Sequence, residues 1–242
     1  MTTEMRTSKV IPRNERLIVA LDVPNAEEAK RLVDELGDAA YFYKIGLELL
    51  TSGGYFELLD WLVRRGSKVF VDLKFFDVPE TVRSAVRGLR NRGVTFATVH
   101  GNQAMLEAAG RDRGDVKILA VTVLTSLDRG DLDDLGFDCD VERLVLSRAR
   151  RALLAGCDGV ISSGLEAAAL RRELGPRLVV VTPGIRPVEN RSVDDQKRTV
   201  DVAQAFANGA DYIVVGRPIR SASDPRAATQ AIQKTIATIF PE

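Results

Sequence analysis

The sequence contains few of the residues that join a chain covalently or bind soft metals. Among its 242 residues are two cysteines, Cys139 and Cys157, and a single histidine, His100. The cysteines form no C-x-x-C pair, so we expect no disulfide framework and take a reducing cytoplasm as the simplest location. One histidine leaves little room for a histidine-rich metal site.

An excess of charge of either sign is also lacking. The 34 basic and 34 acidic side chains give a formal net charge of zero, which offers no electrostatic reason to expect a nucleic-acid or membrane-surface partner. No apolar stretch approaches the roughly 18 residues that a membrane span requires. Residues 1–15 are polar and lack the apolar segment of a secretory signal. We therefore expect an N-terminal tail over 1–15 and one folded domain over 16–242.

The sequence does have a regular alternation of short apolar runs and helical patterns. The runs predict eight strands, over 17–22, 41–46, 68–74, 95–101, 116–124, 159–163, 178–183 and 212–216. The intervening patterns predict eight helices, over 26–36, 55–65, 79–92, 104–110, 141–155, 165–174, 200–208 and 224–239. This alternation fits a single α/β domain, a closed (β/α)8 TIM barrel. An open doubly wound sheet would need a glycine-rich turn after its first strand, where this chain has Asp22-Val-Pro-Asn25.

Charged side chains interrupt the apolar run of the third predicted strand. Strand side chains alternate between faces, so Phe70, Asp72 and Lys74 share one face. Val71 and Leu73 share the other, which suits contact with the helices outside a barrel. We therefore expect Asp72 and Lys74 to point inward at the carboxyl end of this strand.

The first two predicted strands end in the same manner, in Asp22 and Lys44. Three adjacent strands would then bring acid, base, acid and base to one rim, where alternating signs make the crowding tolerable. A buried ion-pair network that only orders the barrel is the alternative, but ion pairs stabilise a fold less well than apolar packing does. Because active sites of this fold lie at the carboxyl ends of the strands, we predict an active site at this rim.

The last two predicted strands end in motifs that suit phosphate. Thr182-Pro-Gly184 follows the seventh and Gly216-Arg-Pro218 the eighth, where barrels often bind phosphate. Glycine lets backbone N–H groups approach an anion, and Arg217 can donate two hydrogen bonds to its oxygens. The long polar loop over 184–198 is either a solvated excursion or, as we expect from its place, an active-site lid.

Taken together, these motifs resemble the orotidine 5′-phosphate decarboxylase family from Leu17 to the final helix. The resemblance is carried by Ala20-Leu-Asp22, Lys44-Ile-Gly46, Asp72-Leu-Lys-Phe-Phe-Asp-Val-Pro-Glu-Thr81, Val121-Thr-Val-Leu-Thr-Ser126, Thr182-Pro-Gly-Ile-Arg186, Asp195-Gln196 and Val215-Gly-Arg-Pro218. It implies a barrel enzyme that decarboxylates orotidine 5′-phosphate to uridine 5′-phosphate in pyrimidine synthesis, with no metal and no cofactor. It also implies a homodimer with two shared active sites.

The resemblance further implies four catalytic residues. Lys74 would donate a proton to C6 of the pyrimidine as carbon dioxide leaves. Asp72 would lie against the substrate carboxylate and disfavour the ground state. Lys44 would bind Asp72 and the ribose, and Asp77 would enter the active site of the neighbouring subunit.

Substrate-binding roles are implied for the remaining motif residues. Asp22 and Thr81 would bind the ribose hydroxyls, with Thr81 coming from the partner chain. Thr125 would contact the pyrimidine, and Arg186 would belong to the lid. The phosphate would be held by Gln196, the amide of Gly216, and Arg217.

Two alternatives remain open at this point. A metal-dependent branch of the same superfamily, which includes 3-keto-L-gulonate 6-phosphate decarboxylase and hexulose-phosphate synthase, has an acidic magnesium ligand near the end of strand two. Lys44 occupies that end here and would repel a divalent cation, which needs oxygen ligands. The other alternative is a nucleotide-binding regulator without activity, which would need Asp22 and the phosphate loops but would have no use for Lys74.

Overall fold

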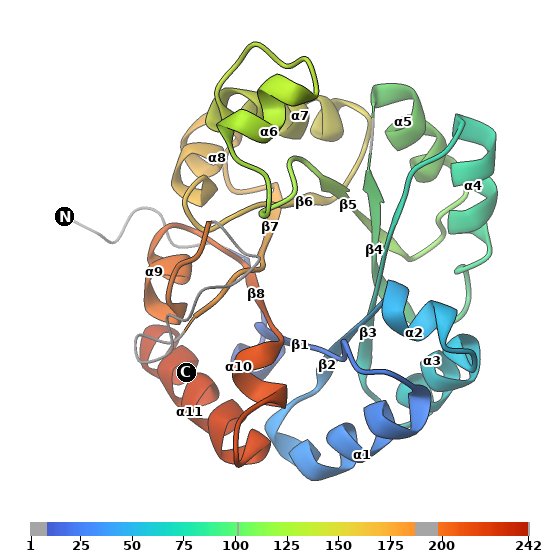
Figure 1. Ribbon diagram of the computed structural model, residues 1–242, viewed down its shortest axis with the longest axis vertical. Coiled ribbons are helices and arrows are strands. Elements are labelled where there is room, and N and C mark those ends of the chain that lie inside the picture. Colours follow the sequence, from blue (N-terminus) through green and yellow to red (C-terminus); the bar gives the residue numbers. More distant parts are fainter. Residues whose placement is uncertain (1–8, 101, 187–197, 242) are drawn as a thin grey trace.

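The computed structural model describes residues 9–100, 102–186 and 198–241. Within them, eight parallel strands pair in chain order, and β8 pairs back with β1 to close a barrel (Figure 1). The strands are β1 Leu17–Ala20, β2 Phe42–Gly46, β3 Lys68–Phe75, β4 Val94–His100, β5 Lys117–Val121, β6 Gly159–Ile161, β7 Val179–Thr182 and β8 Tyr212–Val215. The (β/α)8 prediction is confirmed, although the first and sixth strands end two residues, and the fifth strand three residues, earlier than the apolar runs suggested.

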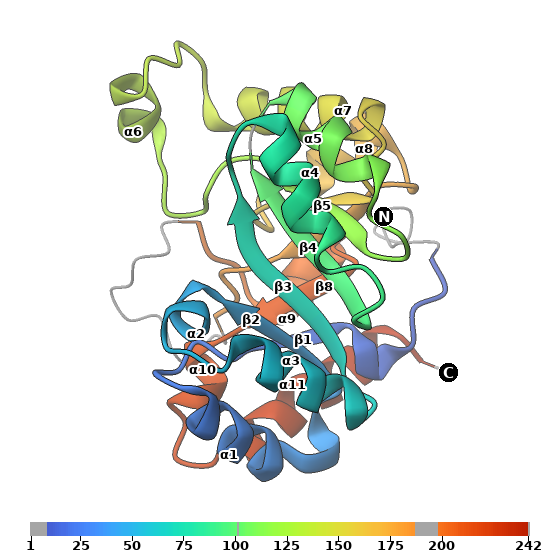
Figure 2. The ribbon, with the colours of Figure 1, turned by 90° about the vertical axis from the view of Figure 1, so that its right-hand side faces the viewer.

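Helices surround the barrel, as Figure 1 shows. The eight that were expected are α1 Ala26–Leu36, α3 Tyr55–Arg64, α4 Pro79–Arg87, α5 Gln103–Arg111, α7 Val141–Leu154, α8 Ala167–Leu174, α9 Val202–Ala207 and α11 Pro225–Ile239. The described residues also form short helices without a sequence prediction: α2 Leu47–Thr51, α6 Arg129–Asp134 and α10 Arg217–Arg220, with the 3-10 turns η1 Arg13–Glu15 and η2 Gly37–Ala39. These short elements complete too few turns to leave a helical period in the sequence. Figure 2 shows α6 and its flanking loops extending away from the barrel.

Polar caps set where several helices begin. Asn25 accepts a hydrogen bond from the backbone of Glu28 at the start of α1, and Asp140 does the same at the start of α7. α4 begins with Pro79, whose missing N–H is no loss at a first helical position. These caps explain why the predicted starts of these helices agree with the structure.

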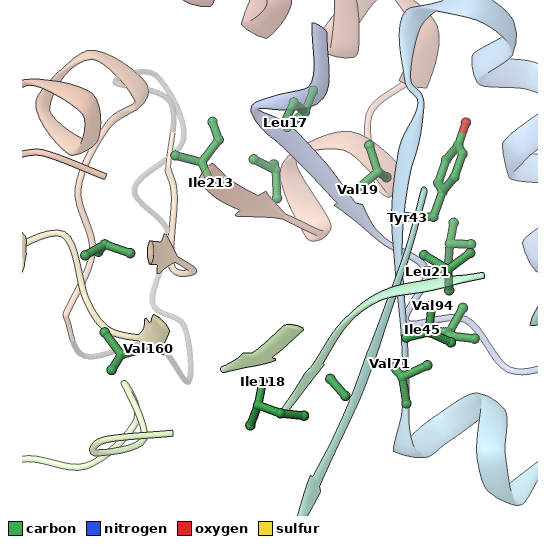
Figure 3. Packing of buried hydrophobic residues seen from close by; sticks show 14 of the residues in the cluster. Leu17, Val19, Leu21, Tyr43, Ile45, Val71, Val94, Ile118, Val160 and Ile213 are labelled. Carbon is green, nitrogen blue, oxygen red and sulfur yellow. The ribbon is translucent and has the colours of Figure 1, made fainter. Parts of the chain in front are cut away.

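The alternation of strand side chains separates two apolar layers. The outer layer lies between the barrel and its helices, and Figure 3 shows part of it, including Leu17, Val19, Tyr43, Ile45, Val71 and Ile213. The inner layer fills the barrel itself with Ile18, Ala20, Phe42, Phe70, Phe96, Leu119, Val181, Tyr212 and Val214. Within it the ring of Phe96 lies 5.3 Å from that of Phe42 and 5.2 Å from that of Tyr212. The barrel is therefore a packed core rather than a pore, and a ligand has room only above these rings.

A buried ionic cluster joins the opposite, amino-terminal ends of β7 and β8. Oδ2 of the fully buried Asp211 accepts hydrogen bonds from Arg171 at 2.6 Å, from Lys9 at 3.0 Å and from the backbone of Val180 at 2.9 Å. The guanidinium of Arg171 is also buried and donates to the carbonyl oxygen of Gly209 at 2.7 Å. Because this cluster lies at the end of the barrel away from the predicted site, we assign it to stability.

No helix in the described parts of the chain combines the length and the apolar composition that a membrane crossing requires.

Candidate active site

A cavity of about 490 Å³ opens at the carboxyl end of the barrel, above the aromatic layer. Its floor includes Phe70 and Ala20, which belong to the inner apolar layer. Eight of the predicted site residues line it: Asp22, Lys44, Asp72, Lys74, Thr125, Arg186, Gly216 and Arg217. The structure therefore brings together charges from the first three strands and the phosphate motifs of the last two.

The four predicted charges form one continuous chain of contacts. Nζ of Lys44 lies 2.7 Å from Oδ1 of Asp22 and 3.6 Å from Oδ2 of Asp72. Nζ of Lys74 donates to both carboxylate oxygens of Asp72 at 3.0 Å. The order is acid, base, acid, base across three strands, as the sequence predicts.

This array keeps its buried members charged. Burial acts to lower the pKa of Lys44, but the carboxylates of Asp72 and Asp22 outweigh it and raise that pKa above its ordinary value. Burial acts in the opposite sense on Asp72, where Lys44 and Lys74 outweigh it and hold the pKa of the carboxyl below its usual range. A hydrogen bond from Thr98 lowers the pKa of Asp72 further. Two members of the array, Lys44 and Asp72, are thus kept ionised although their side chains are largely buried.

The backbone of β3 bends where its catalytic candidates lie. Val71 pairs with Ala97 and Phe75 pairs with Val99, so three residues of β3 stand opposite one residue of β4. Within this bulge Lys74 has a φ of 47°, a left-handed conformation that costs a side chain other than glycine about 1–3 kcal/mol. Strain of this kind persists only where neighbours enforce it, and it is concentrated at functional sites.

The β4 residue opposite the bulge is Thr98, which was not among the predicted site residues. Its fully buried hydroxyl accepts a hydrogen bond from the backbone N–H of Lys74 at 2.9 Å and donates one to Oδ1 of Asp72 at 2.9 Å. A threonine in an apolar strand carries no sequence signal of its own. Only the irregular register of β3 against β4 reveals that it contacts both residues.

Positive charge gathers where β7 and β8 end, and β8 is the neighbour of β1. Arg217 begins α10 directly after Gly216, and Arg186 follows Gly184 after β7. Arg220, which was not predicted, also lines the cavity and donates a hydrogen bond to the carbonyl oxygen of Asp22. Guanidinium groups suit phosphate recognition because they can donate paired hydrogen bonds.

Arg198 is a third residue that sequence reasoning missed. Its buried guanidinium pairs with Oε1 of the buried Glu166 at 2.5 Å and donates to the carbonyl oxygen of Leu124 at 3.0 Å. Leu124 precedes Thr125 in the loop after β5, and Glu166 stands in the loop after β6. Arg198 therefore fixes the loop that carries Thr125 at the edge of the cavity.

Two of the predicted residues, Asp77 and Thr81, do not line the cavity. Asp77 lies in the turn before α4, is exposed, and accepts a hydrogen bond from the backbone of Val78 at 2.6 Å. Thr81 is exposed on α4. Gln196 lies outside the described residues, as does the 187–197 part of the expected lid.

A closed parallel barrel with a charged cavity at the carboxyl ends of its strands defines the class of (β/α)8-barrel enzymes. The family model for the orotidine 5′-phosphate decarboxylase / HUMPS family matches residues 15–232. The chain is 66% identical over 234 residues to the orotidine 5′-phosphate decarboxylase of Methylococcus capsulatus, covering 97% of each protein. It is 55% identical over 231 residues to that of Xanthomonas euvesicatoria, covering 95% of each.

A solved structure gives the same result. The crystal structure of orotidine 5′-phosphate decarboxylase from Lactobacillus acidophilus matches with a TM-score of 0.80 at 37% identity, covering 92% of this chain and 99% of that one. The chain is thus a member of the orotidine 5′-phosphate decarboxylase / HUMPS family.

Proposed function

We propose that the protein converts orotidine 5′-phosphate to uridine 5′-phosphate and carbon dioxide in pyrimidine synthesis, with Lys74 as the proton donor and without metal or organic cofactor. The observation that carries the proposal is the continuous array of Asp22, Lys44, Asp72 and Lys74 in one cavity. The free cysteines of the chain agree with a cytoplasmic enzyme.

The array suggests how the reaction proceeds. The bond between C6 and the carboxyl carbon breaks, carbon dioxide leaves, and the electron pair remains on C6. The Lys74 ammonium would stabilise this pair and then transfer its proton to C6. At an effective dielectric of about 20, two unit charges about 4 Å apart interact by about 4 kcal/mol. Asp72 disfavours the carboxylate of the bound substrate while holding Lys74 in place.

The remaining residues of the cavity, together with Asp22 and Lys44, would bind the substrate. Arg217 and the amide of Gly216 would hold the phosphate, with Gln196 from the segment outside the described residues. Asp22 and Lys44 would contact the ribose, and Thr125 the pyrimidine. Binding energy from a phosphate remote from C6 can be used to organise the reacting end of the substrate. In this role Arg186 would help to enclose the phosphate.

The metal-dependent branch of the family is the main competitor. A magnesium site needs oxygen ligands, and the described residues contain no group of three or more His, Cys, Asp or Glu side chains arranged to hold a metal. Lys44 is buried in the cavity and keeps its charge. A positive charge at that place disfavours a divalent cation by direct repulsion.

The proposal predicts full decarboxylation of orotidine 5′-phosphate in excess chelator. The loss of the orotidine chromophore is followed by ultraviolet absorbance, with and without EDTA, in protein that has been dialysed against chelator. Equal rates in the two conditions are expected, because every charge that the reaction needs comes from the chain. Activity that disappears in EDTA and returns with magnesium would favour the metal-dependent branch instead.

We also propose a homodimer in which Asp77 and Thr81 reach the active site of the partner subunit. Both residues are exposed and do not line the cavity of their own chain. Asp77 lies between Phe76 and Val78, which are 65% and 63% exposed. Exposed apolar residues beside a polar group suit an interface between subunits.

Mixing two inactive variants tests the shared site. Lys74→Ala and Asp77→Asn chains are each expected to be nearly inactive alone, while a mixture is expected to regain up to about a quarter of wild-type activity by random pairing. In the hybrid dimer one site receives both native residues. Subunit exchange is verified by native mass spectrometry of differently tagged chains. Confirmed hybrids without any regained activity would exclude a role for Asp77 across the interface.

A further inference from the structure

The bulge of β3 changes how the side chains of Asp72 and Lys74 are aligned at the centre of the site. A regular strand would direct the side chains of Asp72 and Lys74 inward at even spacing. Here the strand is irregular between Val71 and Phe75, and Lys74 adopts a left-handed backbone conformation. Some neighbour must hold this conformation, because an unsupported lysine would leave it.

One hydroxyl group contacts both ends of the irregular segment. Thr98 accepts from the backbone N–H of Lys74 at 2.9 Å and donates to Oδ1 of Asp72 at 2.9 Å. The same Oδ1 receives Nζ of Lys74 at 3.0 Å. The backbone of Lys74, its ammonium and the carboxylate of Asp72 are therefore joined in a closed loop of hydrogen bonds through Thr98.

Thr98 has the features of a rigid support. Its residue is fully buried, and its strand neighbours Ala97 and Val99 pack into the outer apolar layer. A β-branched side chain has few rotamers, which fixes the direction of the hydroxyl. Thr98 is not among the described residues that line the cavity, so it acts on the substrate only through Asp72 and Lys74.

We propose that Thr98 is a positioning residue that sets the direction of the Lys74 ammonium relative to the Asp72 carboxylate. The inference rests on the proposed decarboxylation and adds a component to it. The Thr98 hydroxyl stabilises the charged form of Asp72 by donating to it, and it holds the Lys74 backbone in the bulge by accepting from it. Without this group, the proton donor and its carboxylate are expected to lose their mutual alignment.

The test is the isosteric variant Thr98→Val, which keeps the shape and removes both hydrogen bonds. We expect kcat to fall by about 10- to 100-fold, the effect of losing a hydrogen bond to a charged group, with a much smaller change in KM. Activity that needs ionised Asp72 is present above its pKa and is lost as pH falls through it. Loss of the donor raises that pKa, so the acid limb of the pH–kcat profile is expected to move to higher pH.

Two further variants separate positioning from packing. Thr98→Ser keeps the hydroxyl and is expected to retain kcat within about threefold of the native enzyme and the native acid limb. Thr229→Val is the matched control, because Thr229 is also buried and donates a hydrogen bond at 2.8 Å, to the carbonyl oxygen of Pro225 on α11. Its kcat and pH profile are expected to be unchanged. If Thr98→Val does not fold, Thr98→Cys replaces it, since a thiol is a weak hydrogen-bond donor and acceptor.

The outcomes distinguish this inference from the function on which it rests. An inactive native enzyme would refute the proposed decarboxylation. An active native enzyme with a folded Thr98→Val variant (or its Cys substitute) of native kcat and acid limb would overturn only the role of Thr98. A Thr98→Ser variant as impaired as Thr98→Val would also overturn it, because the methyl group rather than the hydroxyl would then be needed.

Discussion

Replacement of Lys74 by alanine is expected to lower kcat for orotidine 5′-phosphate by about 10⁴-fold, because the proposed proton donor and its stabilising charge would both be lost. The fold is expected to survive. Asp72 would still have Lys44 at 3.6 Å and the Thr98 hydroxyl at 2.9 Å, so its carboxylate would not be left without partners. The measurement is the steady-state rate by ultraviolet absorbance together with thermal unfolding by circular dichroism.

The matched control for this variant lies on the same strand. Lys68 begins β3 at the far end from the cavity and pairs with Glu15. Lys68→Ala removes the same side chain in the same element, and its kcat is expected to stay within about twofold of native because it touches none of the charges in the cavity. A Lys74→Ala enzyme as active as Lys68→Ala would disprove the assignment of the proton donor. It would leave a nucleotide-binding role for the barrel as the simpler interpretation.

Among the variants proposed for this protein, Asp211→Ala is expected to cause the largest loss in the free energy of unfolding. The substitution leaves the buried Arg171 guanidinium without its carboxylate at 2.6 Å, and an uncompensated buried charge costs about 3–5 kcal/mol. For a domain of this size that corresponds to a fall in the midpoint of thermal unfolding of about 6–20 °C. The kcat of protein that remains folded should be close to native, because the cluster lies at the opposite end of the barrel from the cavity.

An exposed aspartate–arginine pair provides the comparison. Asp34 contacts Arg65 at 2.9 Å, but the two side chains are 58% and 44% exposed. Water and salt screen such a pair, so Asp34→Ala is expected to change the free energy of unfolding by less than about 1 kcal/mol. Urea titrations of both variants under identical conditions provide the comparison. Equal losses of unfolding free energy would mean that burial does not determine how much the Asp211 cluster contributes to stability.

The sequence predicted most of the fold and the charged part of the site because both depend on strand alternation. Phe70 lies in the inner apolar layer, Val71 in the outer one, and Asp72 and Lys74 in the cavity, as a period of two requires. The same rule predicted the inward direction of Lys44. These expectations needed no knowledge of long-range contacts beyond the order of the strands.

What escaped prediction depends on register and on contacts between distant segments. Thr98 is distinguished from other strand threonines only by the bulge opposite it, and nothing in the local sequence of β3 specifies a bulge. Arg198 and Glu166 are 32 positions apart and meet only because the loops after β6 and β7 are neighbours. Nothing in the local sequence distinguishes these two charges from solvated surface charges.

The aromatic layer beneath the cavity also limits how substrate can enter the enzyme and how products can leave it. The rings of Phe42, Phe70, Phe96 and Tyr212 pack against one another and close the barrel beneath the cavity. Neither the gas nor the nucleotide can pass through this layer. Both must leave at the carboxyl ends of the strands, where the nucleotide entered. Whatever covers the mouth of the cavity during the reaction therefore also determines how soon the next substrate molecule can enter.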